Sequence, residues 1–118
     1  MKILVVDDSA TMRRIVLRTL GTMGYTDFVE AENGQVALDA VERGGIGLVV
    51  TDWNMPIMGG LEFVTALRET HADLPVLMVT TNASNQDVIL ALKAGVNNYV
   101  VKPFTPETLR EKVDSVLA

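Results

Sequence analysis

The 118-residue chain contains no cysteine, a single histidine and few aromatic residues, which make up 5% of the sequence. Without cysteine, neither disulfide bonds nor thiolate metal sites are available. No apolar run approaches the roughly 18 residues that a membrane span requires. The apolar stretch at the N-terminus is too short for a signal peptide and is followed at once by acidic residues. Together these absences predict a soluble cytoplasmic protein.

Basic charge is also scarce, because 10 Lys and Arg face 15 Asp and Glu and leave a formal net charge of −5. This balance argues against nucleic acid or an anionic membrane as the partner, since both require a basic surface. It fits a protein that holds a cation with carboxylates. The apolar share of 48% excludes disorder. The length suits one domain with a real core and is too short for two, so we expect residues 1–118 to form a single domain without an output domain.

Strand and helix patterns alternate five times along the chain. Short apolar runs predict buried strands, and apolar positions at helical spacing, including Ile15 and Val36, predict helices that pack on them. The expected strands cover residues 2–6, 27–31, 46–51, 75–80 and 98–101, and the expected helices cover residues 11–23, 33–41, 61–69, 84–94 and 105 onward.

Such alternation implies parallel βαβ units with right-handed crossovers. A closed barrel needs about 250 residues. The predicted fold is therefore α/β and flavodoxin-like, a doubly wound five-stranded parallel sheet of order 2-1-3-4-5 with helices on both faces. In such sheets, ligands bind beyond the carboxyl ends of the strands, at the point where the strand order reverses.

Polar residues follow the predicted strands at this edge: Asp7 and Asp8 after the first, Asp52 after the third, Thr80 after the fourth and Lys102 after the fifth. Each alone has an ordinary interpretation as a turn, a strand residue or a surface charge. Their coincidence at four strand ends makes that interpretation improbable. Three clustered carboxylates repel one another unless a cation joins them, and oxygen ligands of this charge suit Mg²⁺.

The charges at this edge would also admit a phosphoryl group. Three Asp contribute −3, while Mg²⁺ and Lys102 contribute +3, so an incoming dianion is not rejected. A carboxylate such as Asp52 can act as a nucleophile and form an acyl phosphate. Lys102 and the Thr80 hydroxyl could then bind the phosphoryl oxygens.

The chain resembles, from end to end, the receiver domains of bacterial two-component response regulators, and most closely those of chemotaxis. The motifs that carry this resemblance are Val5-Val6-Asp7-Asp8-Ser9, Thr11-Met12-Arg13-Arg14, Thr51-Asp52-Trp53-Asn54-Met55-Pro56, Met58-Gly59-Gly60, Val79-Thr80 and Tyr99-Val100-Val101-Lys102-Pro103-Phe104. In combination these motifs are highly specific.

The resemblance implies a role for each matching position. Asp52 matches the phosphoacceptor, Asp8 the direct Mg²⁺ ligand and Asp7 a ligand that acts through water, and the backbone carbonyl of Asn54 would be a further ligand. Thr80 matches the hydroxyl that moves to meet the phosphoryl group.

The resemblance extends to the residues that would transmit the signal. Lys102 matches the lysine that faces the phosphoryl group, and its bond to Pro103 is similar to the family's cis peptide, which aims the lysine inward. Tyr99 matches the switch aromatic. The expected partner surface consists of Val88, Tyr99, Val101, Phe104 and Lys112.

The implied function is a monomeric phosphorylation switch rather than an enzyme that turns over a substrate. A sensor histidine kinase, CheA in the family, would phosphorylate Asp52, and the flagellar switch protein FliM would read the changed surface; a phosphatase could remove the phosphoryl group. A phosphate sink or relay intermediate is an alternative, because Ser84 and Asn85 stand where close relatives often have Lys, and Thr81 where many have Ala.

Two further alternatives belong to other classes. An aspartate-dependent phosphatase would carry its nucleophile in Asp-x-Asp after the first strand, and a flavodoxin would need bare N–H groups where this chain has acids. Arg13 and Arg14 begin the first helix near the acidic pocket, where they would either assist a phosphodonor or form a solvated face. His71 is interpreted as an ordinary loop residue.

Overall fold

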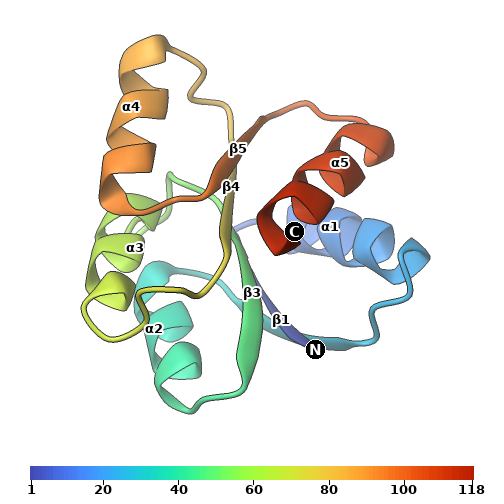
Figure 1. The fold of residues 1–118 in the computed structure, drawn as a ribbon, viewed down its shortest axis with the longest axis horizontal. Helices are drawn as coiled ribbons and strands as arrows, with labels where there is room; N and C mark the ends of the chain where they lie inside the picture. The colour runs from blue at the N-terminus through green and yellow to red at the C-terminus, as the bar shows by residue number, and fades with distance from the viewer.

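The sheet of the protein has five parallel strands in the order β2-β1-β3-β4-β5, as seen in a computed structural model that describes residues 1–118 (Figure 1). This confirms the predicted doubly wound topology. The elements in chain order are β1 (Lys2–Val6), α1 (Ala10–Thr22), β2 (Asp27–Ala31), α2 (Gly34–Glu42), β3 (Ile46–Thr51), α3 (Gly60–Arg68), β4 (Val76–Thr80), α4 (Asn85–Ala94), β5 (Asn98–Val101) and α5 (Pro106–Leu117).

Helices cover both faces of the sheet, with α1 and α5 on one face and α2, α3 and α4 on the other (Figure 1). Alternate residues of β1 supply the two cores because successive strand side chains point to opposite faces. Leu4 and Val6 belong to the cluster that includes Phe63 of α3, whereas Ile3 and Val5 belong to the cluster that includes residues of α1 and α5. The central strands are therefore buried on both sides, as their unbroken apolar runs predict.

Side-chain caps set where four of the five helices begin. Ser9, Asn33, Ser84 and Thr105 each accept a hydrogen bond from the backbone N–H three residues ahead. Such caps satisfy an N–H group that has no partner inside the helix. At its other end α4 stops at Gly95, whose φ of 112° favours glycine.

Some predicted boundaries and core positions are wrong. The third helix, expected over residues 61–69, begins one residue earlier at Gly60, whose N–H donates to the Trp53 carbonyl. β4 begins at Val76 rather than at Pro75. Ile15 and Val36, expected to face the core, are 42% and 41% exposed. An apolar residue at helical spacing lies at the edge of the buried stripe when the helix rotates slightly on the sheet.

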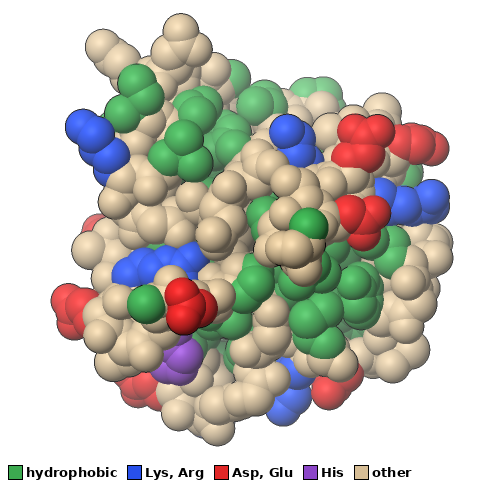
Figure 2. Space-filling view, in the orientation of Figure 1, with side chains coloured by type: hydrophobic (Ala, Val, Ile, Leu, Met, Phe, Trp, Pro, Cys, Tyr) green, Lys and Arg blue, Asp and Glu red, His purple; other side chains and the backbone are tan.

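α4 is the least buried helix, since Ala91 alone among its residues is fully buried. Its exposed side includes three large apolar residues, Ile89, Leu90 and Leu92, each about half exposed. Hydrophobic side chains are visible over this helix in the upper left of Figure 2. None of the helices combines the length and the apolar character that crossing a membrane would require.

Candidate functional site

The strand register places two of the predicted aspartates side by side. Val6 of β1 is paired with Thr51 of β3, so the residues that follow, Asp7 and Asp52, leave the sheet next to each other. The ladder continues one step beyond the strands, because the Asp52 N–H donates to the Val6 carbonyl at 2.9 Å and the Asp7 N–H to the Ala31 carbonyl at 3.1 Å. Backbone hydrogen bonds therefore fix both aspartates at the carboxyl edge, where β1 and β3 meet.

Asp7, Asp8 and Asp52 form one carboxylate cluster. One oxygen from each residue lies within 4.8 Å of the others. Asp7 and Asp52 are almost fully buried, at 4% and 8% exposure, whereas Asp8 is exposed. The cluster thus has a floor of two buried carboxylates and one carboxylate open to solvent.

Lys102 brings a cation into this cluster from the end of β5. Its Nζ donates to Asp7 Oδ2 at 3.0 Å and to Asp52 Oδ2 at 3.2 Å. The Lys102 N–H donates to the Thr80 carbonyl at 2.8 Å, which extends the β4–β5 ladder. The Lys102–Pro103 peptide bond is cis, as the resemblance implied. Residues 95 positions apart in the sequence are therefore joined by an ion pair.

Burial and neighbouring charges shift the pKa values of Asp52 and Lys102. Burial raises the pKa of Asp52; the Lys102 charge and the hydrogen bond from the Trp53 N–H oppose this shift without cancelling it, and the charge of Asp7 adds to it. Burial acts to lower the pKa of Lys102, but its hydrogen bond to Asp7 and the charge of Asp52 outweigh burial and raise that pKa. The pKa of Asp52 is thus raised mainly because the carboxylate is buried, and that of Lys102 because two carboxylates surround it.

The donor set of this cluster fits a hard divalent cation. All three groups are carboxylates, no sulfur or imidazole is present, and their oxygens are close enough to share one ion. With Lys102 the cluster carries a formal charge of −2, which one divalent ion would balance. The exposed Asp8 leaves an entry path from solvent. The acidic cluster could therefore bind a metal.

Thr80 and Tyr99 are connected through one residue of the β4–α4 loop, Asn82. The buried Thr80 accepts a hydrogen bond at its Oγ1 from the Asn82 N–H, at 3.2 Å. The Tyr99 hydroxyl donates to the Asn82 carbonyl, and burial raises the pKa of Tyr99. The Asn54 side chain also donates to Asn82 Oδ1 at 3.0 Å. Sequence reasoning missed Asn82, because nothing in its neighbours indicates that three partners converge on it.

The residues of the expected partner surface have mixed exposure. Val101 is 41% exposed, while Val88, Phe104 and Lys112 are half-buried. The apolar residues of α4 described above were not predicted to belong to this surface. Their run of five apolar residues, Val88 to Leu92, contains no polar position that would mark an exposed side, so the sequence alone indicates burial.

The remaining singled-out residues lie around the cluster. Thr81 is exposed in the β4–α4 loop, Ser84 caps α4, and Asn85 is its first helical residue. His71 is half-buried after α3, where its Nδ1 lies 2.8 Å from the Thr70 hydroxyl. Arg14 is exposed. Arg13 instead turns toward the cluster, and its Nη1 donates to the Asp7 carbonyl at 2.6 Å.

Comparisons with known proteins agree with this fold. Residues 3–114 match the model of the response regulator receiver domain. The chain therefore belongs to the response regulator receiver domain family, and within it the similarity extends to chemotaxis proteins.

Relatives support a role in chemotaxis. The chain is 52% identical over 120 residues to a chemotaxis protein CheY homolog of Campylobacter jejuni, covering 99% of this chain and 92% of that protein. It is 48% identical to the chemotaxis protein CheY of Pseudomonas aeruginosa, covering 98% of this chain and 95% of that protein. Among solved structures, the chemotaxis response regulator CheY4 of Vibrio cholerae is similar with a TM-score of 0.91 at 37% identity, covering 98% of this chain and 97% of that one.

Proposed function

We propose that residues 1–118 act as one receiver domain that accepts a phosphoryl group on Asp52 from a phosphohistidine of a sensor kinase. The observation that carries this proposal is the shared lysine. Lys102 bonds to both Asp7 and Asp52, in a cluster whose third carboxylate, Asp8, is open to solvent. This arrangement supplies a nucleophile, a cation for phosphoryl oxygens and acidic groups for a metal at one strand edge.

The metal in this proposal is Mg²⁺. Asp7, Asp8 and Asp52 would hold it with the backbone carbonyl of Asn54. When bound, the ion neutralises charge on the transferring phosphoryl group. Before the transfer, Lys102 is hydrogen-bonded to both buried carboxylates and holds their oxygens in place.

The transfer itself is a displacement at phosphorus. A carboxylate oxygen of Asp52 forms the new P–O bond while the P–N bond to the donor imidazole breaks, and the electron pair leaves with the imidazole nitrogen. Lys102 then exchanges its contact with Asp52 for a contact with a phosphoryl oxygen. The Thr80 hydroxyl donates to another phosphoryl oxygen, which is a charge-assisted hydrogen bond.

Asn82 offers a route from phosphorylation to the surface. If Thr80 turns toward the phosphoryl group, it gives up the hydrogen bond from the Asn82 N–H, and the Asn82 carbonyl is the acceptor for Tyr99. A hydrogen bond to a charged group contributes about 1.5–3 kcal/mol. It can shift a two-state equilibrium about ten- to a hundredfold, limited by the difference in affinity between the states.

The proposed pathway is chemotaxis, with a CheA-like kinase as donor and a FliM-like motor switch protein as the output partner in the cytoplasm. The relatives named above support this pathway. The proposed contact surface runs over α4, β5 and α5. It comprises Val88, Tyr99, Val101, Phe104 and Lys112, joined by the exposed apolar residues Ile89, Leu90 and Leu92.

The phosphoacceptor is tested by intact-mass measurement after incubation with acetyl phosphate and Mg²⁺. The wild-type protein should gain one phosphoryl group, and Asp52→Asn, which is nearly isosteric, should gain none. Asp114→Asn, which alters an exposed aspartate of α5, is the matched control and should react like wild type. An adduct of equal yield on Asp52→Asn would remove Asp52 from this role, and continuous turnover of the donor would indicate an enzyme.

The output route is tested with the same adduct. Fully phosphorylated Thr80→Ala should bind a FliM-like partner more weakly than the phosphorylated wild type, although both carry the phosphoryl group. Equal partner affinity of the two phosphorylated proteins would refute the route through Thr80. If phosphorylation of the wild type leaves partner affinity unchanged, the phosphate-sink alternative is favoured instead.

A further inference from the structure

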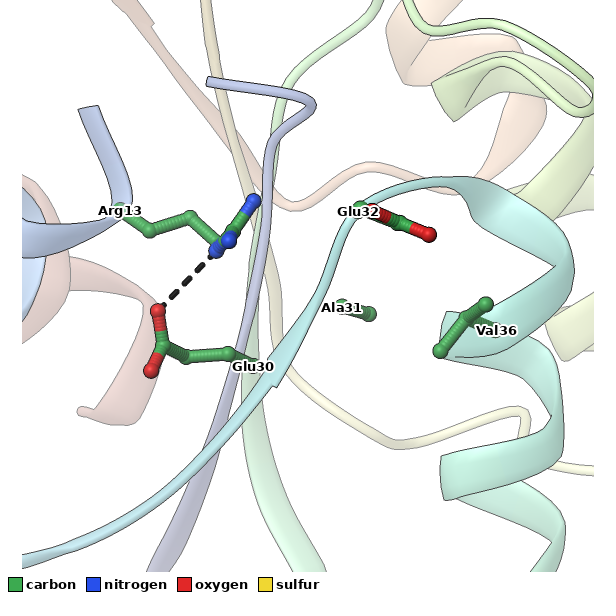
Figure 3. A pocket seen from close by; sticks show the side chains of 5 residues that line it. All are labelled: Arg13, Glu30, Ala31, Glu32 and Val36. Carbon is green, nitrogen blue, oxygen red and sulfur yellow. Dashed lines mark hydrogen bonds and ion pairs between the residues drawn. The ribbon is translucent and has the colours of Figure 1, made fainter. Parts of the chain in front are cut away.

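Arg13 connects the first helix to the loop that carries two of the clustered carboxylates. Its Nη1 donates to the Asp7 backbone carbonyl at 2.6 Å, and its Nε donates to Glu30 Oε1 at 3.0 Å. The Arg13 side chain is 17% exposed and that of Glu30 is 48% exposed. Figure 3 shows the guanidinium held beside Glu30 at the end of β2. Arg13 is therefore not part of a solvated helix face, whereas Arg14 is exposed.

The carbonyl that Arg13 holds belongs to the peptide group that joins Asp7 to Asp8. The rest of Asp7 is already fixed, since its N–H bonds to Ala31 and its Oδ1 accepts from the Ser9 N–H at 2.9 Å. Rotation of the peptide after Asp7 would move Asp8, which is exposed and not held by packing. The Arg13 contact thus opposes rotation of this peptide group, which would carry Asp8 away from the cluster.

A cavity of about 210 Å³ lies beside the guanidinium, and its lining explains why this contact matters. Its walls are Arg13, Glu30, Ala31, Glu32 and Val36, and Figure 3 shows Glu32 and Val36 across the hollow from Arg13. The space beyond the guanidinium is open rather than filled with side chains. Side-chain packing therefore does not hold the guanidinium from this side, and its hydrogen bonds to the Asp7 carbonyl and to Glu30 do.

We propose that Arg13 is a positioning residue for the metal site, with Glu30 holding its guanidinium in place. This inference rests on the proposed function, because it assumes that the carboxylate cluster holds Mg²⁺. Partners behind a metal ligand orient it, and their loss typically weakens metal affinity by about 10- to 100-fold. Arg13 acts in the same way through the backbone carbonyl of Asp7.

The positive charge of Arg13 and its positioning role have opposite effects on Mg²⁺ affinity, which makes the proposal testable. Arg13 is a cation near a cation-binding cluster, so Coulomb repulsion alone predicts that Arg13→Gln binds Mg²⁺ more tightly than wild type. Positioning predicts that Arg13→Gln binds more weakly, by about tenfold or more. Arg13→Lys keeps the charge but loses the planar fork that reaches two partners, so positioning predicts weaker binding and charge alone predicts no change.

The experiment is a Mg²⁺ titration of metal-free protein followed by Trp53 fluorescence. Trp53 is the only tryptophan, and its backbone N–H donates to Asp52 Oδ1 at 2.7 Å. Wild type, Arg13→Gln, Arg13→Lys and the exposed control Arg14→Gln are compared at a temperature where circular dichroism shows each fully folded. We expect a roughly tenfold or larger rise in the Mg²⁺ dissociation constant for Arg13→Gln, an intermediate rise for Arg13→Lys and wild-type affinity for Arg14→Gln.

A double-mutant cycle with Glu30→Gln adds a second test. Positioning predicts that Glu30→Gln weakens Mg²⁺ binding in the wild type but has little effect once Arg13 is Gln, because there is no guanidinium left to hold. Independent charge effects would give the same change in both backgrounds. Unchanged or tighter Mg²⁺ binding by Arg13→Gln overturns the proposal while leaving the proposed function intact. If the wild type shows no Mg²⁺ response, both the proposed metal site and this inference are wrong.

Discussion

Removing Lys102 should destabilise the protein in a way that Mg²⁺ reverses. The Lys102 Nζ lies 3.0 Å from Asp7 Oδ2 and 3.2 Å from Asp52 Oδ2, and the three side chains are 13%, 6% and 11% exposed. Breaking a buried ion pair on one side costs about 3–5 kcal/mol, because it leaves an uncompensated buried charge. The exposed Asp8 side of the cluster admits solvent, so we expect a loss of about 2–4 kcal/mol for Lys102→Met without metal.

Mg²⁺ should narrow this difference in stability between variant and wild type. The ion meets a formal charge of −2 in the wild type and −3 in the variant, so it binds the variant more tightly. A ligand that binds only the folded state stabilises it by RT ln(1 + [L]/Kd), about 2.7 kcal/mol when the ligand is at 100 times its Kd. At equal Mg²⁺ concentration, the variant therefore gains more stability than the wild type.

Urea unfolding followed by circular dichroism, with and without Mg²⁺, measures the free energy of unfolding of the wild type and of Lys102→Met. Lys102→Met conserves side-chain volume, so a loss shared with Lys102→Ala comes from charge rather than from a cavity. The exposed Lys93→Ala of α4 is the matched control and should change the free energy of unfolding by no more than about 0.5 kcal/mol. A metal-free Lys102→Met as stable as wild type, or a difference that Mg²⁺ leaves unchanged, would refute the reasoning.

The pH dependence of the same comparison has a definite sign. Burial acts to lower the pKa of Lys102, but its hydrogen bond to Asp7 and the charge of Asp52 outweigh burial and raise that pKa above 10.5 in the folded state. The contribution of Lys102 to the free energy of unfolding is therefore fully present below pH 10.5. It disappears as the pH rises through the folded-state pKa. The stability difference between wild type and Lys102→Met should therefore shrink in strong alkali, where the lysine loses its charge. It should also shrink in acid, where Asp52, whose pKa burial raises, becomes protonated and no longer needs a cation.

Three further predictions concern neighbouring positions. Metal-free Asp52→Asn should be more stable than wild type at pH 7 by about 0.5–2 kcal/mol. The reason is that burial raises the pKa of Asp52 above 3.8, so its charged form is disfavoured in the folded protein. In urea titrations, this gain in the free energy of unfolding should vanish as the pH falls toward 3.8. Gly60→Ala should lower the urea midpoint strongly and impair phosphorylation, because a Cβ there would collide with the Asp52 backbone oxygen. The control Gly21→Ala has open space around the added Cβ and should raise stability by about 0.5–1 kcal/mol. Tyr99→Phe should take up phosphate like wild type in intact-mass measurements but lose the hydrogen bond to the Asn82 carbonyl, which we expect to weaken partner binding about three- to tenfold.

The sequence determined the fold class and the edge at which the site lies. Unbroken apolar runs such as residues 46–51 indicate strands buried on both faces, and alternation with helices leaves parallel topology as the compact solution. Once strands are parallel, their carboxyl ends share an edge, so the sequence alone predicts that Asp7, Asp52 and Lys102 lie close together. The expected helix over residues 84–94 agrees with the Ser84 cap and with the end of α4 at Gly95, because caps act within one turn of the chain.

Contacts that depend on exact orientation were decided only by the tertiary structure. Helix periodicity does not fix how far a helix rotates on the sheet, so Ile15 and Val36 were assigned to the core and are exposed. The same limit applied to α4, where three apolar residues face solvent. The links of Arg13 to Glu30 and of Tyr99 to Asn82 each join residues 17 positions apart through a single hydrogen bond. Such bonds carry no periodic signal in a sequence, because they depend on side-chain reach across packed elements rather than on local preference.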